Sequence, residues 1–352
     1  MNNEQVVLEV GQLRQFTARV FLASGCPREE AEIVADHLVT SNLMGYDSHG
    51  VIRIPQYLEE VERKIIRPGA PFHVATESDT TAVVECGWNF GQVGGVKAME
   101  VAMRKAEKAH TAAVVARSCN HAGRLGAYTQ MAAERGFFAL GVCNSPRHGH
   151  FVLPWGGRKG RLATNPISYA VPRGSKPPIL ADFSTAESSE GKIRLLRNQG
   201  KPLPRGWIVD TDGEPSTNPT DFYGSHNGPP EGAILPFGGD KGYRGFALSL
   251  LVEILGGLLS GSRTTIDQPG NGLCFLVVDI AAFQSSNQFA GLVEEMCDYV
   301  KSSPPADGFN EVTLPGELDF SIRKQRLLNG IPVDAKTWEE ITSAARSVGV
   351  RW

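Results

Sequence analysis

The chain has 352 residues, of which 41% are hydrophobic and 21% charged, and its 35 basic and 38 acidic residues give a net charge of −3. This size is typical of one large domain or two intertwined domains, and the near balance of charge excludes the basic footprint of a nucleic-acid-binding protein. The most apolar stretch, residues 246–260, contains Glu253 and is shorter than the ~20 residues of a membrane span, so we expect no membrane partner.

The first 64 residues have the patterns of helices. Apolar residues recur at helical spacing over residues 5–22, and a glycine follows as a C-cap. Pro27 opens a second predicted helix, which has acidic residues in its first turn and ends at Gly45. A third helical run contains Pro55, at which the helix either begins or is kinked.

Strands and helices then alternate. The patterns predict strands at residues 80–86, 111–117 and 137–142, and helices at residues 91–110 and 124–135. This order by itself is typical of an α/β layer. The next part of the chain, residues 145–239, is rich in Gly, Pro and Asn, and loops this long inside a compact protein are usually functional.

Short strands are predicted within and after this region. They are expected at residues 167–171 and 179–182, and a buried strand is expected at residues 274–280. Residues 242–259 predict a strongly apolar helix. Amphipathic helices are expected near residues 288–302, 320–328 and 338–348.

Cysteine and histidine patterns give no metal site. The cysteines are far apart, lack a CxxC pair and often lie in apolar runs: Cys26, Cys86, Cys119, Cys143, Cys274 and Cys297. They predict reduced, mostly buried thiols. His148 and His150 have the spacing of a metal pair but no adjacent carboxylate or thiol, so we expect no metal. The first 15 residues lack the basic-then-apolar order of a signal peptide, and we expect a cytoplasmic protein.

The segment DSHGVIRIPQY (residues 47–57) is the most informative one. His49, Arg53 and Tyr57 are spaced at i, i+4 and i+8, so they would share one face of a helix. An imidazole can pass a proton to a forming alkoxide, and a guanidinium can grip a carboxylate in two places. Together they suit a substrate with a carboxylate beside a reducible carbonyl. The alternative is a solvated helix face after an N-cap at Asp47 or Ser48.

Two further positions gather polar groups at predicted strand ends. His121 stands between a strand and a helix, where an α/β layer presents functional side chains, although it could simply hydrogen-bond the backbone. Asp182 ends a short strand and is followed by Ser184 and Thr185, so backbone and hydroxyl donors are concentrated there.

Two glycine–lysine pairs suggest anion binding. Lys192 and Lys241 each lie next to a glycine, which lets backbone N–H groups approach an anion beside the ammonium. Gly242 also begins a predicted helix, whose N-terminus favours phosphate. The chain has neither a GxGxxG fingerprint after a strand nor a P-loop. These sites would therefore suggest pyrophosphate held by an unusual fold; the alternative is turns with solvated lysines.

Taken together, six segments in order resemble the malate/L-lactate dehydrogenase family of the second type, which includes 2,3-diketogulonate reductase, ureidoglycolate dehydrogenase and piperideine-2-carboxylate reductase. They are DSHGVIRIPQY, NHAGRLGAY, ATNPISYAVP, ADFSTAESSEGK, LPFGGDKGYRGFAL and LPGE. The resemblance implies hydride transfer between NAD or NADP and a small 2-oxo or 2-hydroxy acid such as malate or lactate, in a homodimer. It also implies an α+β, non-Rossmann NAD(P)-binding fold with a largely antiparallel sheet, which replaces the α/β expectation. A helical domain would comprise residues 1–75 and 310–352, and an NAD(P)-binding and catalytic domain residues 76–309.

The resemblance also implies roles for individual residues. His49 would donate or accept the proton, Asp182 would be the second catalytic residue, and Arg53 would clamp the carboxylate. Tyr57, His121 and Thr164 would line the substrate pocket with Arg53. The dinucleotide would be held by Ser48, His121, Ile179, Asp182, Ser184, Thr185, Lys192, Lys241, Gly242, Gly316 and Glu317.

The chain departs from the family pattern at two places. Where the family often has alanines before a Gly–Lys pair, this chain has ESSEGK, and Glu187 and Glu190 would alter the cofactor edge. Ser145 stands where the ureidoglycolate branch has a lysine, which argues against that substrate. Reduction of a cyclic imino acid remains an alternative because it needs the same carboxylate clamp. A non-catalytic binding protein is a further alternative, against which the presence of His49 and Arg53 argues.

Overall fold

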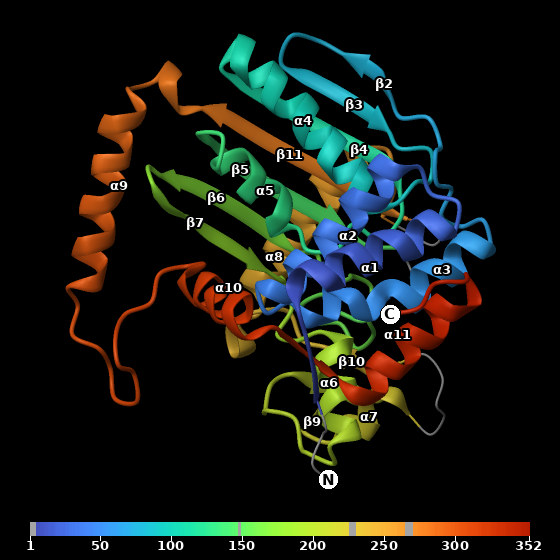
Figure 1. The fold of residues 1–352 in the computed structure, drawn as a ribbon. Coiled ribbons are helices and arrows are strands. Elements are labelled where there is room, and N and C mark those ends of the chain that lie inside the picture. The colour runs from blue at the N-terminus through green and yellow to red at the C-terminus, as the bar shows by residue number, and fades with distance from the viewer. Residues whose placement is uncertain (1–4, 147–148, 225–229, 265–269) are drawn as a thin grey trace.

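The computed structural model describes residues 5–146, 149–224, 230–264 and 270–352 (Figure 1). A seven-stranded mixed sheet runs through these ranges in the order β2-β3-β4-β11-β5-β6-β7. The strands are β2 (His73–Glu77), β3 (Thr81–Glu85), β4 (Thr111–Cys119), β5 (Phe137–Asn144), β6 (Ile167–Arg173), β7 (Lys176–Phe183) and β11 (Asn271–Asp279). β3 and β4 pair in parallel, and each other neighbouring pair in this order is antiparallel.

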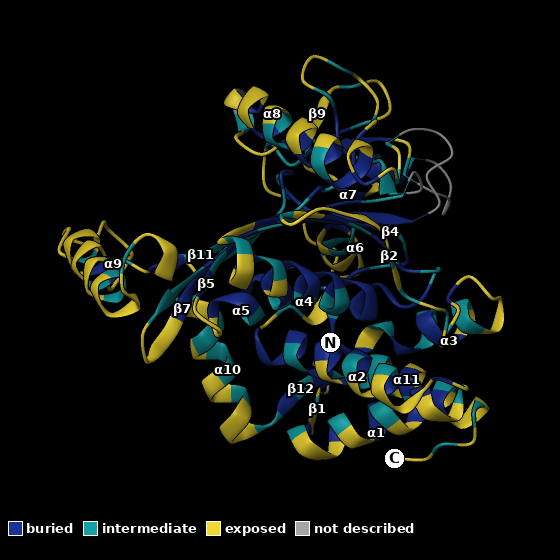
Figure 2. Cartoon of the chain, turned by 90° about the horizontal axis from the view of Figure 1, so that it is seen from above, coloured by how far each residue is buried: buried dark blue, intermediate teal, exposed yellow. Residues whose placement is uncertain are grey.

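Helices cover both faces of this sheet (Figure 2). α4 (Gly91–Ala109) and α5 (Gly126–Ala133) pack on one face, and α4 makes the crossover that a parallel β3–β4 pair requires. α8 (Tyr243–Val252) and the π-helix η5 (Glu253–Leu258) cover the other face. The central strands therefore bury both faces, which explains the nearly continuous apolar run of β11.

The two ends of the chain meet in a second core. β1 (Gln5–Leu8) pairs antiparallel with β12 (Ile331–Asp334). Their buried residues pack in one cluster with helices from both ends: α1 (Val10–Ala23), α2 (Arg28–Leu43), α3 (Ile54–Glu62) and α11 (Ala335–Ser347). Figure 1 shows α11 beside α1 and α3 although more than 270 residues separate them in the sequence.

The remaining elements lie at the edges of the sheet. A small cluster contains β8 (Ile208–Val209), β9 (Pro215–Ser216), β10 (Ala233–Ile234), α6 (Glu190–Asn198) and α7 (Pro219–Tyr223). α9 (Ser286–Lys301) packs on the β6–β7 edge, and α10 (Glu317–Asn329) passes close to β7 and α2. No helix in the described ranges combines the length and apolarity needed to cross a bilayer.

Four sequence predictions are wrong in detail. Residues 5–22 are not one helix, because residues 5–8 form β1 with a partner strand from the other end of the chain. Residues 242–259 are not one α-helix, because the hydrogen-bond pattern changes to a π-helix at Glu253. Residues 47–57 consist of two 3-10 turns and the start of α3. The α/β layer expected from element order is instead a mostly antiparallel sheet.

Candidate active site

The segment that carries His49 is shaped by one glycine and one asparagine. The 3-10 turns η1 (Asp47–His49) and η2 (Val51–Arg53) meet at Gly50. Oδ1 of Asn42 accepts the first N–H of η2 at 2.8 Å, and a Cβ at position 50 would collide with this amide. Only glycine therefore allows α2 to approach so closely. Pro55 follows in the first turn of α3, so that the helix begins there without a kink.

The C-terminal part of the chain fixes the same segment. Arg326 of α10 binds both carboxylate oxygens of Asp47, at 2.6 and 3.0 Å, and also donates to the carbonyl of Asn42. The side chain of Asn42 donates to Asp47 at 2.6 Å. A bidentate guanidinium–carboxylate pair defines orientation as well as distance, so α10 holds the turn that presents His49.

His49 is half-buried among polar partners. Its Nδ1 lies 3.0 Å from Oγ of Ser48, and its ring is stacked on that of His121 with centroids 5.5 Å apart and planes 21° apart. Burial, together with the positive charges of Arg53 and Arg124, lowers the pKa of His49 from 6.5 to about 4. The imidazole is therefore neutral at physiological pH and ready to accept a proton.

Arg53 is held by its own turn. Its Nε donates to the carbonyl of Ser48 at 2.7 Å, and its Nη1 donates to Oε1 of Gln56 at 2.7 Å. A guanidinium has five N–H donors, so these two bonds orient the group and leave three donors for an anion. The charge remains near His49, whose pKa it lowers.

Tyr57 and His121 are joined in a buried chain of hydrogen bonds. The Tyr57 hydroxyl lies 2.7 Å from Nδ1 of His121 and accepts a hydrogen bond from Nε2 of Gln92 at 2.7 Å. Because this hydroxyl already has a donor, it can give its own proton to the imidazole of His121. Burial raises the pKa of Tyr57 well above its ordinary value, which keeps the phenol neutral.

Arg124 is a candidate site residue that the sequence analysis did not identify. Its side chain is 2% exposed, and its Nε and Nη1 have no hydrogen-bond partner in the part of the chain that the structure describes. Its Nη2 donates to Gln130 at 3.1 Å, and its guanidinium carbon lies 5.6 Å from the centre of the Tyr46 ring. The backbone N–H of Arg124 donates to Nε2 of His37. Its place in the NHAGRLGAY segment, three residues after His121, was the available signal.

Asp182 lies at the end of β7, beside the helix that follows Arg124. Its Oδ2 accepts the backbone N–H of Gly126 at 2.7 Å, and its carbonyl accepts the Tyr46 hydroxyl at 3.4 Å. Burial raises the pKa of Asp182, whereas the charge of Arg124 and the N–H of Gly126 oppose that rise. The Tyr46 hydroxyl also donates to Asp319 at 3.1 Å, which links this region to α10.

Thr164, Ser184 and Thr185 lie where the chain leaves β7. The Thr185 side chain is fully buried, and its hydroxyl lies 3.1 Å from the carbonyl of Thr164 and 3.0 Å from that of Asn165. The Ser184 hydroxyl bonds the backbone of Ala186. These hydroxyls therefore fix the local loop, and Thr164 remains half-buried.

Ile179 lies beside the segment of Gly316 and Glu317, which was predicted to hold the dinucleotide together with it. The backbone N–H of Leu180 donates at 3.2 Å to the carbonyl that precedes Gly316, and Gly316 has a φ of 91° and lies against Leu180. Ile179 itself is 6% exposed. The carboxylate of Glu317 pairs with Lys301 at 2.8 Å and so is engaged within the protein.

The two lysine segments also come together. Lys192 is exposed in the first turn of α6, and Lys241 is exposed in a 3-10 turn directly before Gly242, the N-cap of α8. An antiparallel bridge between Ala186 and Pro236 places the two segments side by side. Neither lysine forms an ion pair with a described residue.

One of the glutamates that depart from the family pattern occupies an anion-binding loop. Oε1 of Glu187 accepts the backbone N–H groups of Gly238 and Gly239 at 2.7 and 2.6 Å. Both glycines have a positive φ, 111° and 54°. Glu190 instead accepts the hydroxyl of Tyr223 at 2.7 Å. The loop before Lys241 thus binds an oxyanion already, one supplied by the chain itself.

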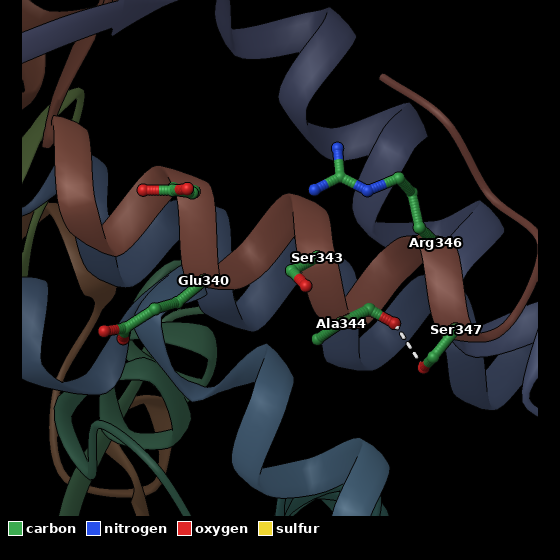
Figure 3. Close-up of a pocket in the computed structure, with 6 residues that line it drawn as sticks. Glu340, Ser343, Ala344, Arg346 and Ser347 are labelled. Atoms are coloured by element: carbon green, nitrogen blue, oxygen red, sulfur yellow. Dashed lines mark hydrogen bonds between the residues drawn. The ribbon is translucent and has the colours of Figure 1, made fainter.

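His150 lies near Ser145, and a surface hollow lies on α11. His150 contacts the carbonyl of Ser145 at 3.2 Å, and His148 lies outside the described residues. Within the described residues, no group of three or more His, Cys, Asp or Glu side chains is arranged to hold a metal ion. A hollow of about 530 Å³ on α11 (Figure 3) is lined by Glu339, Glu340, Ser343, Ala344, Arg346 and Ser347, none of which is a predicted site residue.

The predicted residues thus form three groups. Direct contacts join Ser48, His49, Arg53, Tyr57 and His121. A second group surrounds β7 and contains Thr164, Ile179, Asp182, Ser184, Thr185, Gly316 and Glu317. The third contains Lys192, Lys241 and Gly242. The bond from Tyr46, three residues before His49, to the Asp182 carbonyl connects the first group with the second.

The chain is similar to known dehydrogenases over nearly its whole length. Residues 8–342 match the protein family described as malate/L-lactate dehydrogenase. The chain is 35% identical to a malate dehydrogenase of Pyrococcus horikoshii, over 96% of this chain and 94% of that one, and 33% identical to an L-lactate dehydrogenase of Cupriavidus necator, over 96% of each. The solved structure of a sulfolactate dehydrogenase from Methanocaldococcus jannaschii superposes with a TM-score of 0.89 at 30% identity, over 98% of both chains.

Proposed function

The chain belongs to the malate/L-lactate dehydrogenase family and is an oxidoreductase of hydroxy acids, and we propose that it transfers a hydride between NAD(P)H and a small 2-oxo acid. The contact of His49 with both Ser48 and His121, next to the oriented guanidinium of Arg53, carries this proposal. These residues provide a proton carrier and a carboxylate clamp within one turn of chain. The relatives named for malate, lactate and sulfolactate support a 2-hydroxy acid as the substrate.

His49 is the proposed proton carrier. Because Ser48 engages Nδ1, the other ring nitrogen, Nε2, is assigned to the substrate oxygen. In the oxidation direction a neutral His49 would remove the hydroxyl proton, and a bound nicotinamide would supply the hydride acceptor. In the reduction direction the substrate carboxylate would pair with Arg53 and offset a charge that lowers the pKa of His49, so that the imidazole becomes a better proton donor. Asp182, which Arg124 helps to keep ionised, would stabilise the protonated imidazole.

Arg53 would clamp the substrate carboxylate. Its Nε and Nη1 are engaged with Ser48 and Gln56, so the group is oriented before the substrate arrives. The remaining donors point to end-on binding of a carboxylate. Tyr57, His121 and Thr164 are assigned to the walls of the same pocket.

The dinucleotide would lie along β7 and the loop before α8. A fit is supported by the exposed Lys241 directly before the N-terminus of α8, a position that favours a phosphate group. The N–H groups of Gly238 and Gly239 bind an oxyanion as well, and Glu187 would have to leave them before a phosphate could take its place. Ser48, His121, Ile179, Asp182, Ser184, Thr185, Lys192, Gly242, Gly316 and Glu317 complete the proposed cofactor surface. The mostly antiparallel sheet supports a fold other than Rossmann for this site.

Three further features belong to this proposal. The shared core of both chain ends supports a helical domain from residues 1–75 and 310–352, beside a catalytic domain from residues 76–309. Apolar side chains exposed on α8, on η5 and at the C-cap of η5 support a homodimer: Leu250, Leu251, Ile254, Leu258 and Leu259. Six buried cysteines without a disulfide support a cytoplasmic location.

The test is a screen with both cofactors. Oxaloacetate, pyruvate and a cyclic imino acid are each mixed with NADH or NADPH, and cofactor oxidation is followed. We expect turnover of a 2-oxo acid with at least one cofactor. Turnover of the imino acid alone would assign the alternative reductase activity. Tight dinucleotide binding without turnover of any substrate would refute the proposal in favour of a non-catalytic binding protein.

A further inference from the structure

A second cavity, of about 220 Å³, lies where β3 and β4 end and β11 begins. We propose that it is a binding site for a small phosphate-bearing anion, separate from the proposed active site and independent of hydride transfer. Five of its lining residues carry the argument: Trp88, Arg117, Ser118, Ser262 and Arg263.

Two guanidinium groups give the cavity a positive charge. Arg117 donates through Nε to Glu85 at 2.9 Å, which leaves its Nη groups for another partner. A Cβ on Gly261 would lie 3.1 Å from Nη1 of Arg117, so the end of this guanidinium faces the loop that lines the cavity. Arg263 is exposed, and its guanidinium forms no ion pair or hydrogen bond in the described part of the chain. Glu85 neutralises one of the two charges, and no acidic side chain among the described residues pairs with the other.

The backbone around Arg263 is held in place. Its N–H donates to the carbonyl of Gly257 at 3.1 Å, and its carbonyl accepts the side chain of Asn144 at 3.0 Å. The position of this arginine therefore does not depend on its side chain. A substitution of the guanidinium should leave the loop intact.

Hydroxyl groups line the same space. The Oγ of Ser262 is buried and has no hydrogen-bond partner among the described residues. Buried hydroxyls are normally paired, so one without a described partner at a cavity fits a bound ligand. Ser118 contributes a second hydroxyl at the end of β4.

Backbone strain is concentrated at this cavity. Trp88, Ser118 and Arg263 have φ values of 63°, 54° and 70°, in the left-handed region that non-glycine residues rarely adopt. Two of them are tied together, because the N–H of Trp88 donates to the carbonyl of Ser118 at 2.8 Å. Residues held in such conformations gather at ligand clamps, where the surrounding structure keeps the strained geometry.

The donor set selects the class of ligand. Two guanidinium groups and two hydroxyls approach from different elements, which suits the several oxygens of a tetrahedral phosphate better than a planar carboxylate. The volume of about 220 Å³ is many times the roughly 10–15 Å³ that one water needs, so the cavity can hold a group of several heavy atoms. Trp88 also lines the cavity and would contact the organic part of a small phosphate ester.

Calorimetric titration of the full-length protein tests this site. The probes are inorganic phosphate, glycerol 3-phosphate and malate, each at low ionic strength. Because phosphate can also bind at the proposed cofactor loop, titrations are repeated with Lys241→Gln. Arg263→Gln removes the unpaired guanidinium, and Arg135→Gln is the matched control, since Arg135 is also exposed and unpaired among described residues.

We expect both phosphate probes to bind and Arg263→Gln to weaken them about 10- to 100-fold, as for the loss of a charged hydrogen-bond partner, while Arg135→Gln and Lys241→Gln leave this binding unchanged. Tighter binding of glycerol 3-phosphate than of phosphate would identify an ester as the ligand, and equal binding would identify free phosphate. The proposal is overturned if neither phosphate binds, if malate binds as tightly, or if Lys241→Gln rather than Arg263→Gln removes the affinity. No outcome depends on turnover, so failure here leaves the proposed function untouched.

Discussion

Replacement of Arg124 by glutamine should move the acid limb of the activity profile to higher pH. Arg124 is buried, and its positive charge acts on both proposed catalytic residues and lowers the pKa of His49. Removing a nearby positive charge stabilises the protonated imidazole, so the pKa of His49 rises. The pKa of Asp182 rises as well, because Arg124 opposes the effect of burial on that carboxyl. Both changes shift the profile in the same direction.

The structure limits the size of this change. Burial, Arg53 and Arg124 together lower the pKa of His49 from 6.5 to about 4, a difference of about 2.5. Arg124 is the weakest of the three causes, so it accounts for at most a third of that difference, or about 0.8. Arg124→Lys retains the charge and should change the profile much less.

The assay is kcat/KM for oxidation of the preferred 2-hydroxy acid as a function of pH, which reports the pKa values of the free enzyme. Protein kept at neutral pH is diluted into each buffer immediately before the measurement, so that acid unfolding does not distort the limb. The reasoning is refuted if the limb of Arg124→Gln stays at its wild-type position or moves to lower pH. It is also refuted if Arg124→Lys shifts the limb as far as Arg124→Gln does.

Three other predictions follow from the same contacts. Arg53→Lys should raise KM for the 2-oxo acid more than it lowers kcat. Loss of a charge-assisted pair costs roughly 2–4 kcal/mol, so kcat/KM should fall about 30- to 1,000-fold. An unchanged KM would show that the carboxylate is bound elsewhere. Burial lowers the pKa of His37 from 6.5 to about 3, so below pH 6.5 the unfolded chain binds a proton at this residue and the native chain does not. Between neutral pH and about pH 5 this difference should lower the free energy of unfolding by about 2 kcal/mol. Chemical denaturation of His37→Gln should show a smaller loss over the same pH range. Light scattering should give twice the chain mass for the wild type and a monomer for Ile254→Asp. The control Leu292→Asp, on the exposed face of α9, should remain dimeric. A monomeric wild type would contradict the dimer.

Local patterns predicted the elements whose signals are local. The second helix begins directly after Pro27 and ends before Gly45 as expected, and β4 covers the strand predicted at residues 111–117. Pairings between distant segments left no such signal. β1 was taken for part of a helix because its partner, β12, lies more than 320 residues away. β2 is largely exposed and lacks a buried alternation, so nothing in its sequence marked it as a strand.

In the candidate site, too, local patterns revealed some residues, whereas contacts between distant segments left no signal. His49, Arg53 and Tyr57 could be selected by residue type and spacing, although the helix assumed for them is interrupted at Gly50. The contact of Tyr57 with His121 joins segments 64 residues apart, and periodicity does not reveal it. Arg124 was overlooked because a buried, incompletely paired arginine looks like any surface arginine in a sequence.

A single-turnover comparison of wild type and His49→Gln tests most directly whether His49 carries the proton in a dinucleotide-dependent reaction. Protein saturated with NAD(P)H is mixed with the preferred 2-oxo acid, and loss of the reduced cofactor is followed, while dinucleotide affinity is measured separately by fluorescence. We expect His49→Gln to bind the dinucleotide within about twofold of wild type and to lose about 10²- to 10⁴-fold in the rate of hydride transfer, the usual contribution of a positioned proton carrier. A rate close to that of wild type would contradict the assignment of His49.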